Sequence, residues 1–296
     1  MIIDVPKGSQ LPALRNLWQE AFGDTEEFLN TFFATAFSAD RCRIATENGT
    51  VAAMLYWFDC LFEDRPVAYV YAVATAKAFR GQGLCHKLLA DTHRHLEARG
   101  YAGTVLVPGS ESLFRFYKAM GYEAFGGLRE LSCDRAETSV SLTEIDKTEY
   151  AALRRKLLPK GGILQEKENL DFLETQATFY KGSDFLLAAR TEGDTLYGIE
   201  LLGNKTAAAG IVCALGCKKG QFRTPGTEKD RPFAMYRPIK KEFRLRNSRA
   251  ERGRLRHLPI ARVRIHSGAF FCCKGSTFLY NKKGGPMPTY FGFAFE

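Results

Sequence analysis

The stretch Val73-Ala-Thr-Ala-Lys-Ala-Phe-Arg-Gly-Gln-Gly-Leu-Cys85 decides the fold of this chain. The apolar run 67–73 predicts a buried strand, and the apolar residues after the second glycine recur at helical spacing. The order is therefore strand, glycine turn, helix. The glycines let the backbone approach a ligand closely, and the first N–H groups of a helix have no intrahelical partner. Together with the helix dipole, they predict an anion site suited to a phosphate or pyrophosphate.

A glycine pair before a helix is also typical of a plain tight turn. No Lys-Ser/Thr pair follows, so the stretch is not a nucleotide P-loop, and it lacks the Gly-x-Gly-x-x-Gly spacing of dinucleotide sites. A second motif follows about thirty residues later. The apolar run 103–108 predicts another strand, and the residues after it predict a helix over 110–120 that leads into Phe116-Tyr-Lys-Ala-Met-Gly-Tyr122.

These two motifs resemble those of the GNAT acetyltransferases. The family's acetyl-CoA motif, Arg/Gln-x-x-Gly-x-Gly/Ala, is matched from Arg80 to Gly83, with Cys85 where the family has Gly or Ala. Its Phe-Tyr-x-x-x-Gly-Phe/Tyr motif is matched in full at 116–122. The resemblance covers about residues 1–135. It implies an α/β (α+β) fold, with a central mixed, mostly antiparallel sheet flanked by helices, and a catalytic domain over 1–137.

The resemblance implies acetyl-CoA as cosubstrate. The N–H groups of 80–85 would hold its pyrophosphate, with side-chain donors from Arg80 and Gln82. Backbone groups of 73–75 would hold the pantetheine arm and polarise the acetyl carbonyl. Ser110 stands where many members carry Asn. The implied cofactor-binding residues are Val73, Ala74, Thr75, Arg80, Gly81, Gln82, Gly83, Leu84, Cys85 and Ser110.

Tyr117 is the implied general acid, because the family places this hydroxyl toward the CoA sulfur. A phenol with a reference pKa of about 10 is protonated at neutral pH and can protonate a departing thiolate. The alternative is an ordinary core tyrosine. The sequence does not identify the general base. Glu63, Asp64 and Glu123 lie near the right strands, but each is better explained as an ordinary surface carboxylate, and a water chain would also serve.

The second half predicts helices over 142–158, 169–180 and 207–215, and strands over 184–189 and 195–202. This order again resembles a GNAT lobe, but without the cofactor motif. The resemblance is to tandem acetyltransferases, such as the enhanced-intracellular-survival type, whose second lobe has lost the CoA site. A second lobe over 138–296 is therefore expected, with 235–238 and 288–296 as neighbouring strands within it.

The positive charge of the chain is concentrated in one segment. Residues 240–264 hold ten Lys and Arg against two Glu, whereas 1–239 are nearly neutral, in a chain of net charge +9. We interpret 240–285 as a basic insertion with a solvated face. The alternative is an RNA or acidic-partner patch, but aromatic residues that could stack bases are sparse there.

The eight cysteines include no Cys-x-x-Cys pair, so we expect no metal site, although zinc bound by Cys213, Cys217, Cys272 and Cys273 is conceivable. His93 and His95 are expected at solvated helix positions, and His86 near the helix start could approach a phosphate. No run is long enough to span a membrane and no signal peptide is evident, which predicts a cytoplasmic protein.

The sequence thus predicts an N-acetyltransferase that moves acetyl from acetyl-CoA to an amine of a small molecule or peptide. The alternative from another class is a non-catalytic CoA-binding or scaffold protein with a decayed site, marked by Cys85 and Ser110. A third hypothesis is an RNA-associated protein acting through 240–264. The sequence does not identify the amine, and an exposed sheet edge at the lobe junction would permit a homo-oligomer.

Overall fold

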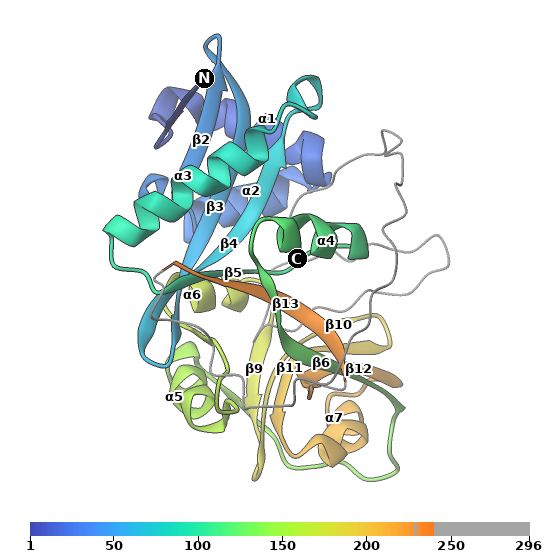
Figure 1. Cartoon of the computed structure of the whole chain (residues 1–296). Coiled ribbons are helices and arrows are strands. Elements are labelled where there is room, and N and C mark those ends of the chain that lie inside the picture. Colours follow the sequence, from blue (N-terminus) through green and yellow to red (C-terminus); the bar gives the residue numbers. More distant parts are fainter. Residues whose placement is uncertain (228–229, 240–296) are drawn as a thin grey trace.

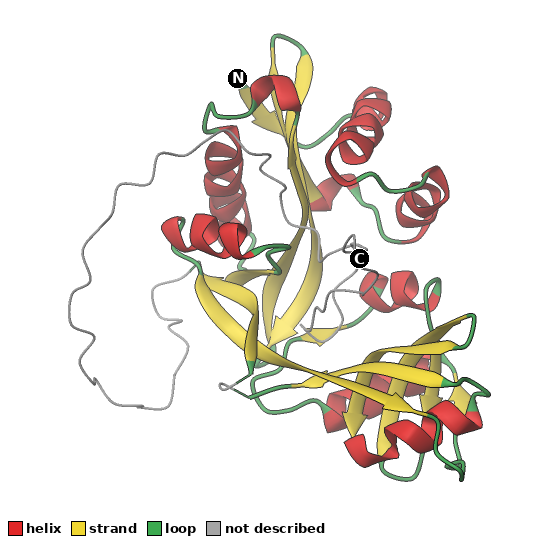
Figure 2. Ribbon diagram, turned by 90° about the vertical axis from the view of Figure 1, so that its right-hand side faces the viewer, coloured by secondary structure: helices red, strands yellow, loops and turns green. Residues whose placement is uncertain are grey.

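A single thirteen-stranded sheet runs through the computed structural model, which describes residues 1–227 and 230–239. The strand order is β1-β2-β3-β4-β5-β13-β6-β12-β11-β10-β9-β7, and β8 pairs with β3. Among the described strands, only the pairs β4–β5 and β11–β12 are parallel. The predicted mixed, mostly antiparallel sheet flanked by helices is confirmed (Figures 1 and 2).

The first lobe contains these elements: β1 (Ile2–Asp4), α1 (Leu11–Phe22), α2 (Glu26–Thr35), β2 (Cys42–Glu47), β3 (Thr50–Phe62), β4 (Arg65–Thr75), α3 (Leu84–Ala98), β5 (Gly103–Leu106), α4 (Glu111–Ala119) and β6 (Glu123–Asp134). The second lobe contains these: β7 (Thr143–Ile145), α5 (Lys147–Leu157), β8 (Leu164–Gln165), α6 (Glu168–Glu174), β9 (Thr178–Lys181), β10 (Phe185–Glu192), β11 (Thr195–Gly203), α7 (Ala208–Ala214) and β12 (Lys219–Pro225). The last described strand is β13 (Arg231–Pro238).

The helices of the first lobe cover both faces of its sheet. Helices α1 and α2 bury their apolar side chains in one core, which includes Trp18, Phe32 and Tyr71. Helix α3 contributes to a second core on the other face, together with Tyr117 of α4. The sequence accounts for the start of α2 locally, because Thr25 caps this helix. The Thr25 hydroxyl accepts a hydrogen bond from the Phe28 N–H at 3.2 Å.

The long β3–β4 hairpin lies between these two cores and is buried almost throughout. Strand β13 corrects the prediction that 235–238 is a strand of the second lobe. It lies between β5 and β6 and pairs antiparallel with both, with Met235 opposite Leu106 on one side and Ala124 on the other. Tyr236 packs in the core beneath α1 and α2, and Met235 packs in the core beneath α3.

An apolar run identifies a strand but not the strands that it pairs with. The sequence therefore did not reveal that the chain returns to the first lobe at β13. The other expected strand, 288–296, lies outside the described residues.

The prediction over 169–180 was wrong in detail. The expected helix is the short α6 followed by β9, because a short helix and a short strand merge into a continuous apolar pattern. Residues 123–134 form the single strand β6. The helix predicted over 207–215 is confirmed as α7.

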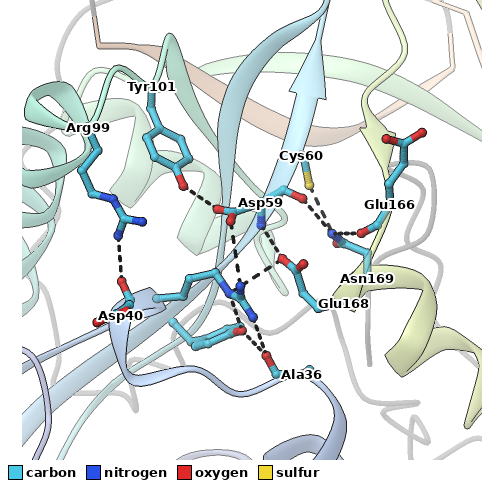
Figure 3. Close-up of polar contacts among 11 residues, drawn as sticks. Ala36, Asp40, Asp59, Cys60, Arg99, Tyr101, Glu166, Glu168 and Asn169 are labelled. Carbon is cyan, nitrogen blue, oxygen red and sulfur yellow. Dashed lines mark hydrogen bonds and ion pairs between the residues drawn. The ribbon is translucent and has the colours of Figure 1, made fainter.

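The second lobe contacts the first lobe through α6 and β8. Strand β8 pairs with the end of β3, with Gln165 opposite Cys60. Figure 3 shows Glu168 and Asn169 of α6 pointing at Asp59 and Cys60 of β3. Glu168 accepts the Asp59 N–H at 3.0 Å, and the Asn169 amide donates to the Asp59 carbonyl at 2.8 Å. We call this group, with Arg41, the lobe clamp.

Candidate cofactor and active site

Strands β4 and β5 pair over only three residues and then separate. Val67–Tyr69 lie opposite Gly103–Val105, whereas β4 continues to Thr75. A register shift against β3 occurs in this continuation. Ala72 there has φ +50°, in the left-handed region, which is unusual for a residue with a side chain. The edge of β4 that faces away from β3 is therefore open beyond Tyr69, which leaves backbone groups of 70–75 for a ligand. Figure 1 shows β4 and β5 diverging.

The glycine turn lies directly after this open edge. Gly81 has φ +77 and Gly83 has φ +73, both in the left-handed region. Glycine adopts this conformation readily because it has no Cβ. Helix α3 begins at Leu84, so its first N–H groups point into the space before the helix. The Arg80 Nε–H donates to the Thr75 carbonyl at 3.0 Å, which ties the turn to the end of β4.

A cavity of about 230 Å³ opens between the end of β4, the turn, α3 and α4. Six predicted cofactor-binding residues line it: Thr75, Arg80, Gly81, Gly83, Leu84 and Cys85. Phe79, His86, Leu113 and Phe116 complete the lining and were not among the predicted site residues. His86 is exposed here, near the start of α3, as the sequence suggested. Two motifs that are distant in sequence thus meet at one cavity.

The remaining predicted cofactor residues do not line the cavity. Val73 and Ala74 are buried on β4 just before Thr75, where they can act only through their backbone. Gln82 is exposed, and its side chain lies 3.4 Å from the Ala78 carbonyl. Ser110 caps α4, with its Oγ 3.4 Å from the Leu113 N.

Tyr117 is fully buried and does not line the cavity. Its ring contacts Phe116, which does line the cavity, and Tyr122, with centroid distances of 5.1 and 5.7 Å. The structure therefore places the predicted acid one side chain behind the cavity wall. The three carboxylates weighed as bases, Glu63, Asp64 and Glu123, are all exposed.

The cavity has features that fit acetyl-CoA. The Thr75 Oγ1 is buried without a hydrogen-bond partner in the protein, and it belongs to a residue of the cavity wall. A buried hydroxyl of this kind is costly unless a ligand satisfies it. Arg80 supplies a positive charge beside the helix N-terminus, which favours an anion there.

His93 corrects the expectation of a solvated helix position. Its side chain is buried between α3, β5 and β13, and burial together with the charge of Arg237 lowers its pKa to about 3. The helical period alone gave no signal for this, because Arg237 lies 144 residues away in sequence.

Three further expectations concern metal binding, the basic segment and the membrane. Among residues 1–227 and 230–239, no group of three His, Cys, Asp or Glu side chains is arranged to hold a metal. Cys213 and Cys217 are free thiols, while Cys272, Cys273 and the basic segment 240–264 lie outside the described residues. No helix in the described part of the chain has both the length and the apolar character needed to cross a membrane.

Comparisons with known proteins give a family match and a shared fold. Residues 3–125 match the family model of the acetyltransferase (GNAT) domain. A probable N-acyltransferase from Enterococcus faecalis V583 has a similar structure, with TM-score 0.62 and 16% identity over 80% of this chain and 72% of that one. A GCN5-related N-acetyltransferase from Anabaena variabilis ATCC 29413 has TM-score 0.63 and 15% identity over 81% and 73% of the two chains.

The likeness also extends to Eis1 from Mycobacterium abscessus. That protein has TM-score 0.58 and 11% identity, over 81% of this chain and 74% of that one. At such identities these structures establish the shared fold alone. A comparison with curated protein sequences found no match.

Proposed function

Since residues 3–125 belong to the GNAT acetyltransferase family, we propose that this acyltransferase moves acetyl from acetyl-CoA to an amine of a small molecule or peptide. The observation that carries the proposal is the cavity itself. It joins the open N–H groups at the start of α3, the Arg80 guanidinium and the partnerless Thr75 hydroxyl at the end of an open strand edge.

The N–H groups of the turn and of the first turn of α3 would hold the pyrophosphate, with Arg80 beside them. Gln82, which is exposed, would add a donor from the solvent side. Ser110 would act through its cap of α4, which fixes the helix that carries Leu113 and Phe116 to the cavity. The backbone of 73–75 would hold the pantetheine arm along the open edge of β4.

Acetyl-CoA supplies an activated thioester. The neutral amine nitrogen bonds to the acetyl carbon, the carbon–sulfur bond breaks, and the amine loses one proton to solvent or a base. An N–H from the open edge of β4 would stabilise the charge that develops on the acetyl oxygen, an effect worth about 3 kcal/mol. Tyr117 would give its proton to the departing thiolate, and its ring contacts Phe116 of the cavity wall.

Residues 138–227 form, in this proposal, a second GNAT-like lobe without a cofactor site. This part repeats the order of helices, then a hairpin, then a helix. The turn between the hairpin strand β11 and helix α7 holds no Arg-x-x-Gly motif. Its role would be to support the first lobe through the lobe clamp and through β13.

One observation favours the alternative function, a non-catalytic CoA-binding or scaffold protein. Tyr117 is fully buried and the candidate bases are exposed, so these groups do not converge on the cavity in this conformation. Both functions require binding of acetyl-CoA, but only the acetyltransferase turns it over. Binding and turnover assays together therefore separate the two functions.

The test is calorimetric titration with acetyl-CoA of the wild type, Arg80→Glu, Gly83→Glu and the control Arg94→Glu. Arg94 lies on the same helix but is 71% exposed and pairs with Asp91 within α3. We expect micromolar binding to the wild type and the control, and none to the Arg80 and Gly83 variants. Absence of binding to the wild type would refute the cofactor site.

Turnover then separates the two functions. Wild type and Tyr117→Phe are assayed with a panel of primary amines by thiol release. We expect the variant to bind acetyl-CoA normally and to lose a factor of about 10² in kcat. Equal rates would refute the acid role of Tyr117, and binding without any turnover would favour the scaffold alternative.

A further inference from the structure

A buried polar network connects α3, β5, the start of β6 and β13. His93 of α3 has its Nε2 2.9 Å from the Tyr122 hydroxyl, and the Thr104 hydroxyl of β5 donates to the same oxygen at 2.9 Å. Arg237 of β13 reaches across and donates to the Nδ1 of His93. All except Arg237 are buried, and Arg237 is half-buried.

Arg237 determines which ring nitrogen of His93 carries the proton. A guanidinium can only donate, so the Nδ1 of His93 must accept and the ring proton must be on Nε2. Nε2–H then donates to the Tyr122 oxygen. The low pKa of His93, caused by burial and then by the charge of Arg237, keeps the ring neutral. The chain of donors therefore has one direction, from Arg237 through His93 to Tyr122.

The Arg237 side chain also lies beside the glycine of the Phe-Tyr-x-x-x-Gly-Tyr motif. Gly121 has φ +86°, and a Cβ placed on it would lie 3.6 Å from the Nε of Arg237. The Arg237 side chain thus passes over the motif glycine before it reaches His93. The next residue, Tyr122, holds its ring edge-on to Tyr117, at 74°. One side chain of β13 contacts both the glycine and, through His93, the tyrosine that packs on the proposed acid.

We propose that Arg237 is a positioning residue that holds the Tyr117 ring through His93 and Tyr122. The inference rests on the proposed function, because the purpose of the alignment is the proton transfer from Tyr117. The proposal also gives β13 a role. This strand follows the second lobe in sequence and carries the arginine that aligns Tyr117 in the first lobe.

The test uses the full chain with Arg237→Met, which keeps the apolar stem and removes every donor. Arg129→Met is the matched control, because Arg129 lies on the adjacent strand β6 and pairs with Asp230 at 3.2 Å, away from the network. Arg237→Lys is the conservative variant, and thermal unfolding verifies that each variant is folded. Two readouts follow: the ¹⁹F spectrum of 3-fluorotyrosine placed at position 117, and steady-state kinetics of the unlabelled proteins.

We expect Arg237→Met to split or broaden the fluorine resonance and to lower kcat about ten-fold, a part of what a general acid contributes. The KM for acetyl-CoA should stay within about two-fold, since the cavity lining is unchanged. Arg237→Lys should recover part of the rate, and Arg129→Met should match the wild type. Because the network acts through Tyr117, adding Arg237→Met to Tyr117→Phe should cost no further rate.

An unchanged fluorine resonance in Arg237→Met would overturn the proposal, as would additive losses in the double variant. If the wild type binds acetyl-CoA but acetylates no amine, the proposed function fails, and the fluorine spectra alone then decide whether Arg237 positions Tyr117.

Discussion

His93 shows how a single buried residue gives the fold a pH dependence. The unfolded chain carries histidine at its reference pKa of 6.5, while the folded value is about 3. Below pH 6.5 the unfolded state binds a proton that the native state does not, so stability is lost as pH falls toward 3. At pH 5 this one group lowers the free energy of unfolding by about 2 kcal/mol.

Urea unfolding at pH 7.5 and pH 5 measures this loss, with His93→Gln as the reference that cannot titrate. We expect the wild type to lose about 2 kcal/mol more than the variant between the two pH values. Equal losses would mean that His93 is not held neutral in the native protein.

Cys85 offers a chemical probe of the cofactor site. Its side chain is partly exposed and lines the cavity, whereas burial raises the pKa of the Cys42 and Cys60 thiols well above their ordinary value. Thiolate is the reactive form, so N-ethylmaleimide at pH 8 should label Cys85 and spare the buried pair.

Saturating CoA should slow the labelling of Cys85 at least about ten-fold, because a ligand in the cavity covers its sulfur. Cys213 on α7 is the internal control and should react at the same rate with or without CoA. Mass spectrometry of peptides reads both rates in one sample. Unprotected Cys85 would place the cofactor elsewhere.

Sequence reasoning succeeded at this scale where the chemistry is local. The glycine turn and the Phe-Tyr motif are each a continuous stretch of sequence, so each can be recognised from its own residues. The positive φ of Ala72 depends on the pairing with β3, and the burial of His93 depends on β13. Residues near them in sequence give no sign of either feature.

Among the elements, α6 depends most on a contact that its own sequence does not reveal. Its seven residues are too few to be stable alone, and its lobe clamp fixes it to β3. Glu168 is the centre of the clamp, because it accepts the Asp59 N–H and lies 3.7 Å from the Arg41 Nε.

Glu168→Ala should lower the free energy of unfolding by about 1–3 kcal/mol, because it leaves the half-buried Asp59 amide without its acceptor and removes a carboxylate from beside Arg41. Glu166→Ala is the matched control, since that carboxylate makes an exposed pair with Arg155. Such a pair is worth about 0–1 kcal/mol. Urea titration of both variants gives the comparison. If the lobe clamp contributed nothing to stability, Glu168→Ala and Glu166→Ala would lower the free energy of unfolding by the same small amount.

The same contrast explains which elements were predictable. The strand before the glycine turn, within β4, and helix α3 appear where the sequence places them, because each is a long run with a clear pattern of buried residues. The boundary between α6 and β9 was missed, because a short helix and a short strand produce no distinct period.

For the whole molecule, the first lobe is not a contiguous segment of chain. Its sheet needs β13 between β5 and β6, and the cores on both sheet faces contain residues of that strand. Residues 1–137 alone would expose the edges of β5 and β6 and leave Gly103 without the ring of Tyr236 over it.

We therefore expect residues 1–137 to be insoluble or to lack cooperative unfolding when expressed alone. Co-expression with 138–296 should restore a soluble complex, because the missing strand is then supplied in trans. Solubility and a ¹H–¹⁵N spectrum distinguish the cases. A soluble, cooperatively folded 1–137 would show that β13 is dispensable for the sheet.

The late position of β13 also affects the synthesis of the protein. A ribosome that has just made β6 must add roughly 100 further residues before β13 exists, which takes about 5–20 s at ordinary elongation rates. During that time the nascent chain carries two sheet edges and half-built cores. Folding of this sheet therefore waits for β13, and chaperones that shield unpaired strands have their longest opportunity on the nascent chain before residue 231 emerges.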